Sequence, residues 1–222
     1  MNDLEMAVDL CLGIGQRPLV SQSAAEGNRD EEALVGAARD GDRAAFERLY
    51  REHSRMVHGI LLARAPRAEV DDLVQDVFLL AMRRLATLRE AASFGPWIAA
   101  IARNRANDYH RRAPETVELP PDLPSERSTD AEAVWVLETI KTLPEAYRET
   151  LILRLVEGMT GPEISGRTGL TPGSVRVNLH RGMQQLREKL ARGSQEGAKG
   201  SREGTRGSRE GTGDSREEEE NE

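Results

Sequence analysis

The sequence has almost no cysteine and few aromatic residues, and both scarcities narrow the possible folds. One cysteine, Cys11, stands among 222 residues, which excludes an internal disulfide and a cysteine-based zinc site and makes a reducing compartment the simplest setting. Aromatic residues make up 4% of the chain and charged residues 31%. This composition favours helices rich in Ala, Leu, Arg and Glu over sheets of aromatic and β-branched residues. We therefore predict an all-α protein.

Long apolar runs and catalytic spacings are also missing. No apolar stretch approaches the roughly 20 residues that cross a bilayer, and the first residues carry Asp3, Glu5 and Asp9 in place of the cations of a secretory signal. The four histidines are spread over three predicted helices without HExxH spacing, and no Gly-rich phosphate loop occurs. We expect a cytoplasmic protein that is not an enzyme, with no cofactor and no metal.

Acidic charge dominates the chain as a whole, yet two segments are basic. The net charge of -7 argues against nucleic-acid binding by the whole chain. Residues 83–112, however, hold seven arginines against two acids, and residues 167–192 hold six cations against one acid. We call these segments the first and second basic islands. Any nucleic-acid contact is expected to concentrate there.

Helical periodicity divides the chain into two units. Residues 1–29 lack sustained periodicity and predict a flexible extension. Four helices are predicted within 30–112, beginning with the acids Asp30, Glu31 and Glu32 in a first helical turn. The Pro- and acid-rich segment 113–129 predicts a linker, 130–192 a second helical unit, and the Gly-rich repeats of 193–222 a disordered tail.

The third and fourth predicted helices of the first unit carry distinct faces. One apolar stripe marks the buried side of the third helix, and it consists of Val70, Leu73, Val74, Val77, Ala81, Leu85 and Leu88. The fourth helix has a polar stripe of Asn104, Asp108 and Arg111, flanked by Arg103, Arg105 and Arg112. This stripe fits either a binding surface or a solvated face with an Asp108–Arg111 or Asp108–Arg112 pair. Phe94 and Trp97 are expected in the core rather than in base stacking.

Residues 163–190 have the pattern of a helix-turn-helix. Thr160 and Glu163 form a capping-box sequence, and Thr171 precedes Pro172 at the first position of the next helix. With Val175 and Leu179 buried, the outward residues of that second helix are Ser174, Arg176, Val177, His180 and Arg181. Arg176 could bind guanine O6 and N7, and Arg181 is better placed for phosphate. The alternative is a helical hairpin whose second helix packs on another helix.

These motifs together resemble region two and region four of extracytoplasmic-function sigma factors of bacterial RNA polymerase. The region-two likeness rests on 72–78 (DLVQDVF), 94–97 (FGPW) and 101–112 (IARNRANDYHRR). The region-four likeness rests on 143–144 (LP), 153–154 (LR), 157–158 (EG), 163–164 (EI) and 173–175 (GSV). The resemblance spans about residues 30–192, in the family's order.

The resemblance implies a division of labour. Core RNA polymerase would bind through its β′ clamp helices and β flap, with Asp72, Gln75 and Asp76 as the clamp-binding residues. The −10 promoter element would be captured by Arg103, Asn104, Asp108, Arg111 and Arg112. The −35 element would be bound by Ser174, Arg176, Val177, His180 and Arg181. An anti-sigma protein is a further expected partner, and membrane insertion is not expected.

Some residues depart from the family pattern. Ser165, Gly166 and Thr168 replace apolar residues in the first motif helix, and Gly182 interrupts the second at an expected cost of about 1 kcal/mol relative to Ala. A stand-alone helix-turn-helix regulator is the alternative function. It would bind duplex DNA tightly without polymerase, whereas a sigma factor would not.

Overall fold

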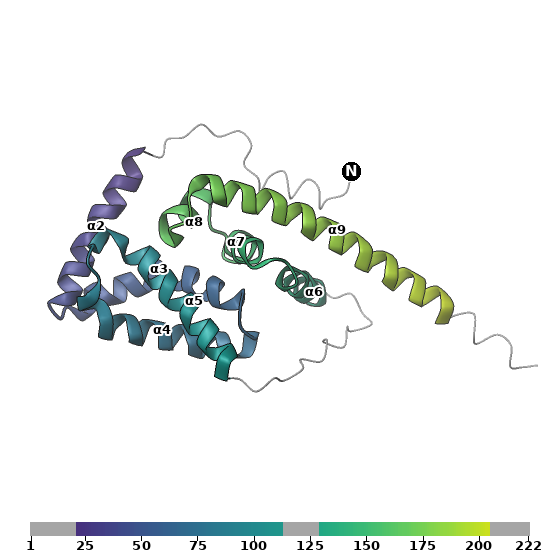
Figure 1. The fold of residues 1–222 in the computed structure, drawn as a ribbon, viewed down its shortest axis with the longest axis horizontal. Coiled ribbons are helices and arrows are strands. Elements are labelled where there is room, and N and C mark those ends of the chain that lie inside the picture. Colours follow the sequence, from purple (N-terminus) through teal and green to yellow (C-terminus); the bar gives the residue numbers. More distant parts are fainter. Residues whose placement is uncertain (1–20, 113–128, 205–222) are drawn as a thin grey trace, which may run out of the picture.

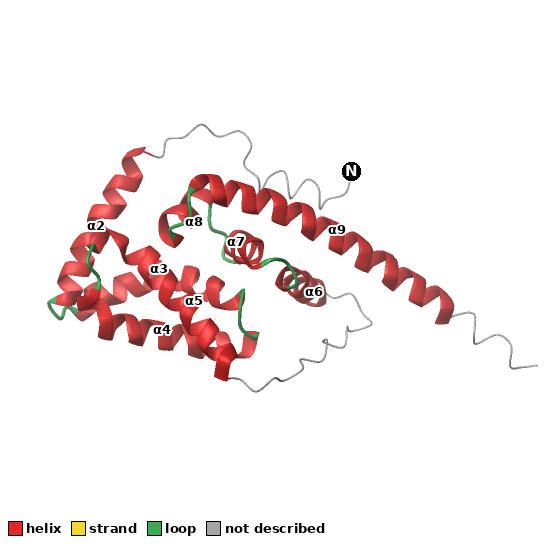
Figure 2. Ribbon diagram, viewed as in Figure 1, coloured by secondary structure: helices red, strands yellow, loops and turns green. Residues whose placement is uncertain are grey.

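A computed structural model describes residues 21–112 and 129–204 of the chain. Cys11, the linker up to Ser128 and the last residues of the tail lie outside this part. The regular elements within the described ranges are α-helices and short 3-10 helices, and no strand occurs there (Figure 2). The α-helices are α2 (Ser21–Arg39), α3 (Arg43–Leu62), α4 (Val70–Arg84), α5 (Phe94–Arg112), α6 (Thr129–Lys141), α7 (Glu145–Leu155), α8 (Gly161–Thr168) and α9 (Pro172–Gly204). The predicted all-α class is confirmed.

The first unit packs α2, α4 and α5 around α3. Asp42 caps α3 by accepting a hydrogen bond from the Ala44 backbone N–H at 2.8 Å, which satisfies a donor that the first helical turn leaves free. The whole stripe predicted for the third helix is buried. Phe94 is fully buried and Trp97 packs partly against the same core, so the prediction that both belong to the core is confirmed.

The second unit contains the helix-turn-helix. The Thr160 backbone N–H donates to Glu163 Oε2 at 2.8 Å, and the Thr160 side chain caps α8 in return, so the predicted capping box is present. Gly169 ends α8 with a φ of 78°, a left-handed conformation that glycine adopts without strain. Helix α9 then begins at Pro172, as predicted, and packs against α6, α7 and α8.

Two predicted boundaries are wrong, and both errors concern helix length. Helix α2 begins at Ser21 rather than at Asp30, so Asp30, Glu31 and Glu32 lie within it and not in its first turn. Helix α9 continues past Gly193 to Gly204. Extending a helix that tertiary packing has already nucleated costs little per residue, because the unfavourable first turn has been formed. The lengths predicted from local composition are therefore too short for both helices.

The expected cost of Gly182 is offset by packing that the sequence did not reveal. A Cβ added at Gly182 would lie 3.1 Å from Leu151 Cδ1 and 3.1 Å from Tyr147 Cβ. Glycine therefore lets α9 approach α7 closely. A Cβ at Gly193 would likewise lie 3.0 Å from the Trp135 ring, so this residue is a contact point between α9 and α6 rather than a helix end.

The two units pack directly against each other. Helix α3 contacts α7 and α8, and α5 contacts α8 (Figure 1). Two glycines permit this approach: a Cβ at Gly59 would lie 2.8 Å from Leu153 Cδ2, and one at Gly95 would lie 3.0 Å from the Arg167 carbonyl oxygen. The first basic island consequently lies partly beneath the second unit.

Candidate nucleic-acid interface

The second basic island presents its predicted residues to solvent. Val175, Met183 and Leu186 bury the inner side of α9, and the Ser174 backbone N–H donates to Thr171 Oγ1 at 3.1 Å at the start of the helix. The outer face is exposed and comprises Ser174, Arg176, Val177, His180 and Arg181. No helix of the described chain covers this outer face, although the inner side of α9 packs on α7.

The first basic island lines a cavity of about 480 Å³ between α4 and α5. Three of the predicted residues form part of its wall: Asn104, Asp108 and Arg111. The remaining lining residues are Leu80, Arg84, Ile101, Arg105 and Asn107. The cavity therefore combines amide, carboxylate and guanidinium groups above an apolar floor, which is a suitable chemistry for a nucleobase and its phosphate.

Ion pairing orders the outer wall of this cavity. Arg111 donates to Asp108 across one helical turn, so the pair considered for a solvated face is present. Its hydrogen bond to Arg111 holds the pKa of the Asp108 carboxyl below the ordinary value. Asp108 therefore remains an anion and an obligate acceptor at neutral pH, able to accept a hydrogen bond from a base amino group.

Helix α4 connects the cavity with an acidic face. Arg105 Nε donates to Asp76 Oδ2 at 3.1 Å, which links a predicted polymerase-binding acid to the cavity wall. Asp72 and Gln75 are exposed beside it. The face continues with Leu79 and Met82, whose exposed fractions are 49% and 54%. Large apolar side chains this exposed beside charged residues are typical of a binding surface.

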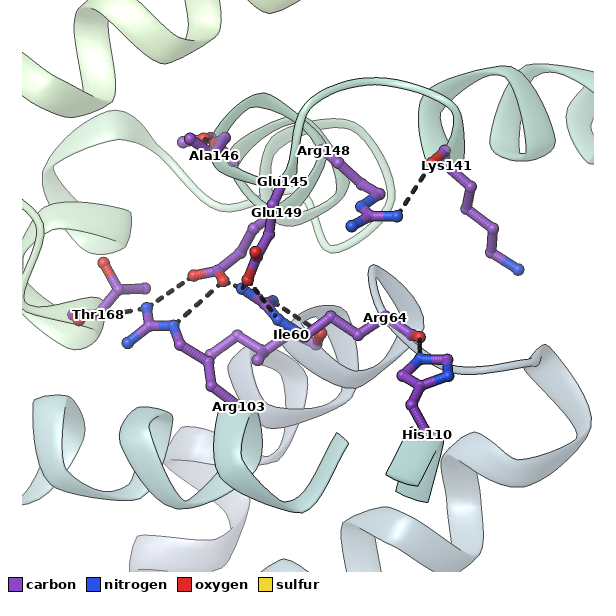
Figure 3. A network of polar contacts seen from close by, with 11 residues as sticks. Ile60, Arg64, Arg103, His110, Lys141, Glu145, Ala146, Arg148, Glu149 and Thr168 are labelled. Atoms are coloured by element: carbon purple, nitrogen blue, oxygen red, sulfur yellow. Dashed lines mark hydrogen bonds and ion pairs between the residues drawn. The ribbon is translucent and has the colours of Figure 1, made fainter. Parts of the chain in front are cut away.

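Arg103 and Arg112 have different surroundings from the rest of the predicted −10 set. Arg112 is exposed at the end of α5. Arg103 instead turns toward the second unit, where its Nη2 donates to Glu149 Oε1 at 2.7 Å (Figure 3). The structure thus places Arg103 outside the cavity, one residue away from Asn104 along the helix but in a different polar cluster.

Several residues of these surfaces were not predicted. Leu79 and Met82 had a usable signal, because they are apolar and fall off the buried stripe of their helix. Arg84 and Asn107 had only their proximity to predicted residues. No sequence signal pointed to Glu149, because its partner Arg103 lies 46 residues away in the sequence. Only the docking of the units brings the two side chains together.

Other kinds of site find no support in the described ranges. Within residues 21–112 and 129–204, no three His, Cys, Asp or Glu side chains gather as metal ligands would. Over the same residues, no helix has the length and apolarity that a bilayer crossing requires.

Comparison with known families gives two matches in chain order. Residues 49–115 match the family profile described as Sigma-70 region 2, and residues 133–186 match Sigma-70, region 4. RNA polymerase sigma factor CarQ of Myxococcus xanthus is 34% identical over 162 residues, covering 68% of this chain and 92% of that protein. ECF RNA polymerase sigma factor ShbA of Streptomyces griseus is 31% identical over 189 residues, covering 72% and 97%.

A solved structure has the same arrangement of helices. The structure of CnrH in complex with the cytosolic domain of CnrY superposes with a TM-score of 0.54 at 25% sequence identity, and covers 73% of this chain and 97% of that one. The likeness therefore extends over both units. A helix-turn-helix regulator standing alone is disfavoured, because the N-terminal unit matches a family of its own.

Proposed function

The chain belongs to the sigma-70 family as an extracytoplasmic-function RNA polymerase sigma factor, and from this we propose how its surfaces divide the work. As a sigma factor it directs core RNA polymerase to promoters for transcription initiation. It contributes binding and DNA melting rather than covalent chemistry. The proposal concerns which described residues contact polymerase and which contact each promoter element.

The face of α4 binds the β′ clamp helices of the polymerase. Asp72, Gln75 and Asp76 supply its polar part, and Leu79 with Met82 supply an apolar part that is exposed in the free protein. Apolar contact provides the burial that drives association, while the acids select a basic partner and fix the register. The second unit would meet the β flap.

The cavity between α4 and α5 accepts an unstacked base of the melted −10 element. Asn104 and Asp108 offer hydrogen-bonding groups to a base edge, and Arg84 and Arg111 offer cations to the flanking phosphates. This cavity is the observation that carries the proposal, because capture of an extruded base requires both a pocket and a cationic rim. Arg112 extends the rim along α5.

The exposed face of α9 binds the −35 element as duplex DNA. Arg176 lies in the first turns of the helix, where recognition helices contact base edges in the major groove. Arg181 is available to a phosphate. An anti-sigma protein is a further proposed partner, supported by the likeness to CnrH, whose structure was solved in complex with a second protein.

Run-off transcription with purified core polymerase and a genomic fragment library tests the proposal. We expect site-selective initiation only when the sigma factor is present, and loss of initiation at those sites when Asn104 and Asp108 are both replaced by Ala. The matched control is the double variant Glu47→Ala/Arg51→Ala, an exposed pair on α3. Initiation by the Asn104/Asp108 variant at the wild-type level would remove the cavity from promoter capture.

A further inference from the structure

Two arginines of the first unit hold one carboxylate of the second. Glu149 Oε2 lies 2.6 Å from Arg64 Nη1, and Glu149 Oε1 lies 2.7 Å from Arg103 Nη2 (Figure 3). The side chains of Glu149 and Arg64 are each 6% exposed. The cluster is therefore a buried anion site in which Glu149 is the anion.

The side chains of this cluster are ionised at neutral pH. Burial opposes ionisation of Glu149, but the hydrogen bonds and positive charges of Arg103 and Arg64 outweigh it and keep the pKa of the carboxyl below its ordinary value. Arginine is always protonated in proteins. Glu149 is the carboxylate shared by both cations, whereas Glu145 pairs with Arg64 alone. The Arg103 fork contacts both oxygens of Glu149, with Nε lying 3.2 Å from Oε2.

The two arginines lie next to His110 in the first unit. Arg103 and His110 are seven residues apart on α5 and so share a face, and His110 Nε2 hydrogen-bonds the Arg64 carbonyl oxygen. This face lies beside the Asn104, Asp108 and Arg111 stripe of the cavity. A strand whose base enters the cavity would carry its backbone past this face.

The docked arrangement cannot persist on a promoter. The −10 and −35 elements lie about 25 base pairs apart, which is about 85 Å at 3.4 Å per base pair. The two units are in direct contact in the structure, so engagement of both elements requires them to separate. Separation removes Glu149 from Arg64 and Arg103 and leaves two neighbouring cations without their anion.

We propose that Arg64 and Arg103 form a binding site for a backbone phosphate of the melted promoter strand, and that Glu149 occupies this site as an internal competitor while the units are docked. The inference rests on the proposed function, since the strand reaches the site only if the cavity takes the −10 element. Guanidinium groups bind carboxylate and phosphate with the same fork geometry. Arg64, which no sequence pattern suggested, becomes a nucleic-acid contact.

Salt-dependent binding of a mixed-sequence single-stranded DNA 12-mer to the full chain tests the site. Phosphate contacts carry no sequence information, so the readout does not depend on the promoter. Glu149→Gln should bind more tightly than wild type, and its slope of log affinity against log salt should be steeper by about 0.7, the value for one more neutralised phosphate of a single strand. Adding Arg64→Ala to Glu149→Gln should abolish the increase.

Glu145→Gln is the matched control. Glu145 also bonds Arg64, with its Oε1 3.1 Å from Arg64 Nε, but its side chain is 63% exposed and it is paired with Arg64 rather than with Arg103. Its replacement leaves Glu149 in the site, so the slope should match wild type. If the slope were steeper in Glu145→Gln and unchanged in Glu149→Gln, the competitor would be Glu145 and the inference about Glu149 would be wrong.

Fluorescence transfer between dyes on α4 and α9 separates the possible outcomes. If Glu149→Gln lowers the transfer and leaves the salt slope unchanged, the arginines do not bind phosphate. If neither the transfer nor the salt slope changes, Glu149 is not the occupant of the site. If the variant fails to fold, saturating oligonucleotide must still reduce transfer in wild type more than in Arg64→Ala, and equal reductions would overturn the inference. Failure of run-off transcription with a steepened slope would instead count against the proposed promoter function alone.

Discussion

The two basic islands have similar compositions but opposite surroundings. In the first island, Arg103, Arg105 and Arg111 are each paired with a carboxylate, supplied respectively by Glu149, Asp76 and Asp108. In the second, no carboxylate of the described chain pairs with Arg176 or Arg181. The surface proposed to bind duplex DNA therefore has no internal ion pair at Arg176 or Arg181, whereas the surface proposed to bind the melted strand would have to exchange internal carboxylates for phosphates. Excess arginine in a sequence does not by itself show which arginines are available.

The largest effect is expected from Asp76→Arg. It replaces the acid that holds Arg105 with a like charge and reverses the charge of the α4 face, while the 45% exposure of the Asp76 side chain spares the core. We expect the variant to fold and to lose association with core polymerase, as measured by co-purification. Asp71→Arg, an exposed neighbour outside the proposed face, should still co-purify. Unchanged association of Asp76→Arg would remove α4 from polymerase binding.

Arg176→Ala examines the unpaired island. A bidentate contact to guanine should cost about 1 to 3 kcal/mol, and only at promoters that carry guanine at the contacted −35 position. Initiation rates on a panel of −35 variants give the measurement. Arg187→Ala, exposed further along α9, should lower all rates equally or not at all. An equal loss across the panel for Arg176→Ala would make that residue a phosphate contact.

Gly182→Ala examines how the second island is seated. Helix propensity alone predicts a gain of about 1 kcal/mol, but the new Cβ would lie 3.1 Å from atoms of both Leu151 and Tyr147, and overpacking of this kind costs about 1 to 3 kcal/mol. We expect a lower free energy of unfolding in urea. At Gly166 nothing lies within 4 Å of an added Cβ, so Gly166→Ala should raise it. If both variants were more stable than wild type, α7 would have to shift enough to accommodate the added methyl group, and the overpacking argument for Gly182→Ala would be wrong.

The sequence predicted those features that depend on neighbouring residues. The capping box at Thr160 and the cap at Thr171 each arise within one helical turn, and the buried stripe from Val70 to Leu88 follows from the periodicity of consecutive turns. The exposure of the α9 face followed because burial of Val175 fixes the direction of every other side chain on a rigid helix. Local rules sufficed for both motifs.

Features that depend on docking were not predictable from local patterns. The sequence alone presents Gly182 as a helix-weakening residue, because the helix it packs against is distant in the sequence, and it gives no sign that Gly59 lies at a contact between the units. The ion pair of Arg103 with Glu149 is not predictable, because charge and spacing cannot distinguish a cation that faces solvent from one that faces a carboxylate of the other unit. The same limitation hid Arg64.

The smallest effect concerns His58, which lies at the junction of the two units. His58 Nδ1 lies 2.6 Å from Glu157 Oε1. The hydrogen bond to Glu157 raises the pKa of His58 above 6.5, burial opposes the shift, and the other charges facing the ring are Asp71, which raises the pKa, and Arg67, which lowers it.

Because this pKa is raised by docking, protonated His58 stabilises the docked state below pH 6.5, and the contribution disappears as pH rises through the shifted pKa. Half-exposed pairs contribute about 0 to 1 kcal/mol, so the docked fraction should fall slightly between pH 6 and pH 8 as measured by fluorescence transfer between the units. Glu149 does not contribute to this change, because its lowered pKa confines its titration to acid below 4.5. His58→Gln should flatten the profile; a profile that persists in this variant would assign the pH dependence to another group.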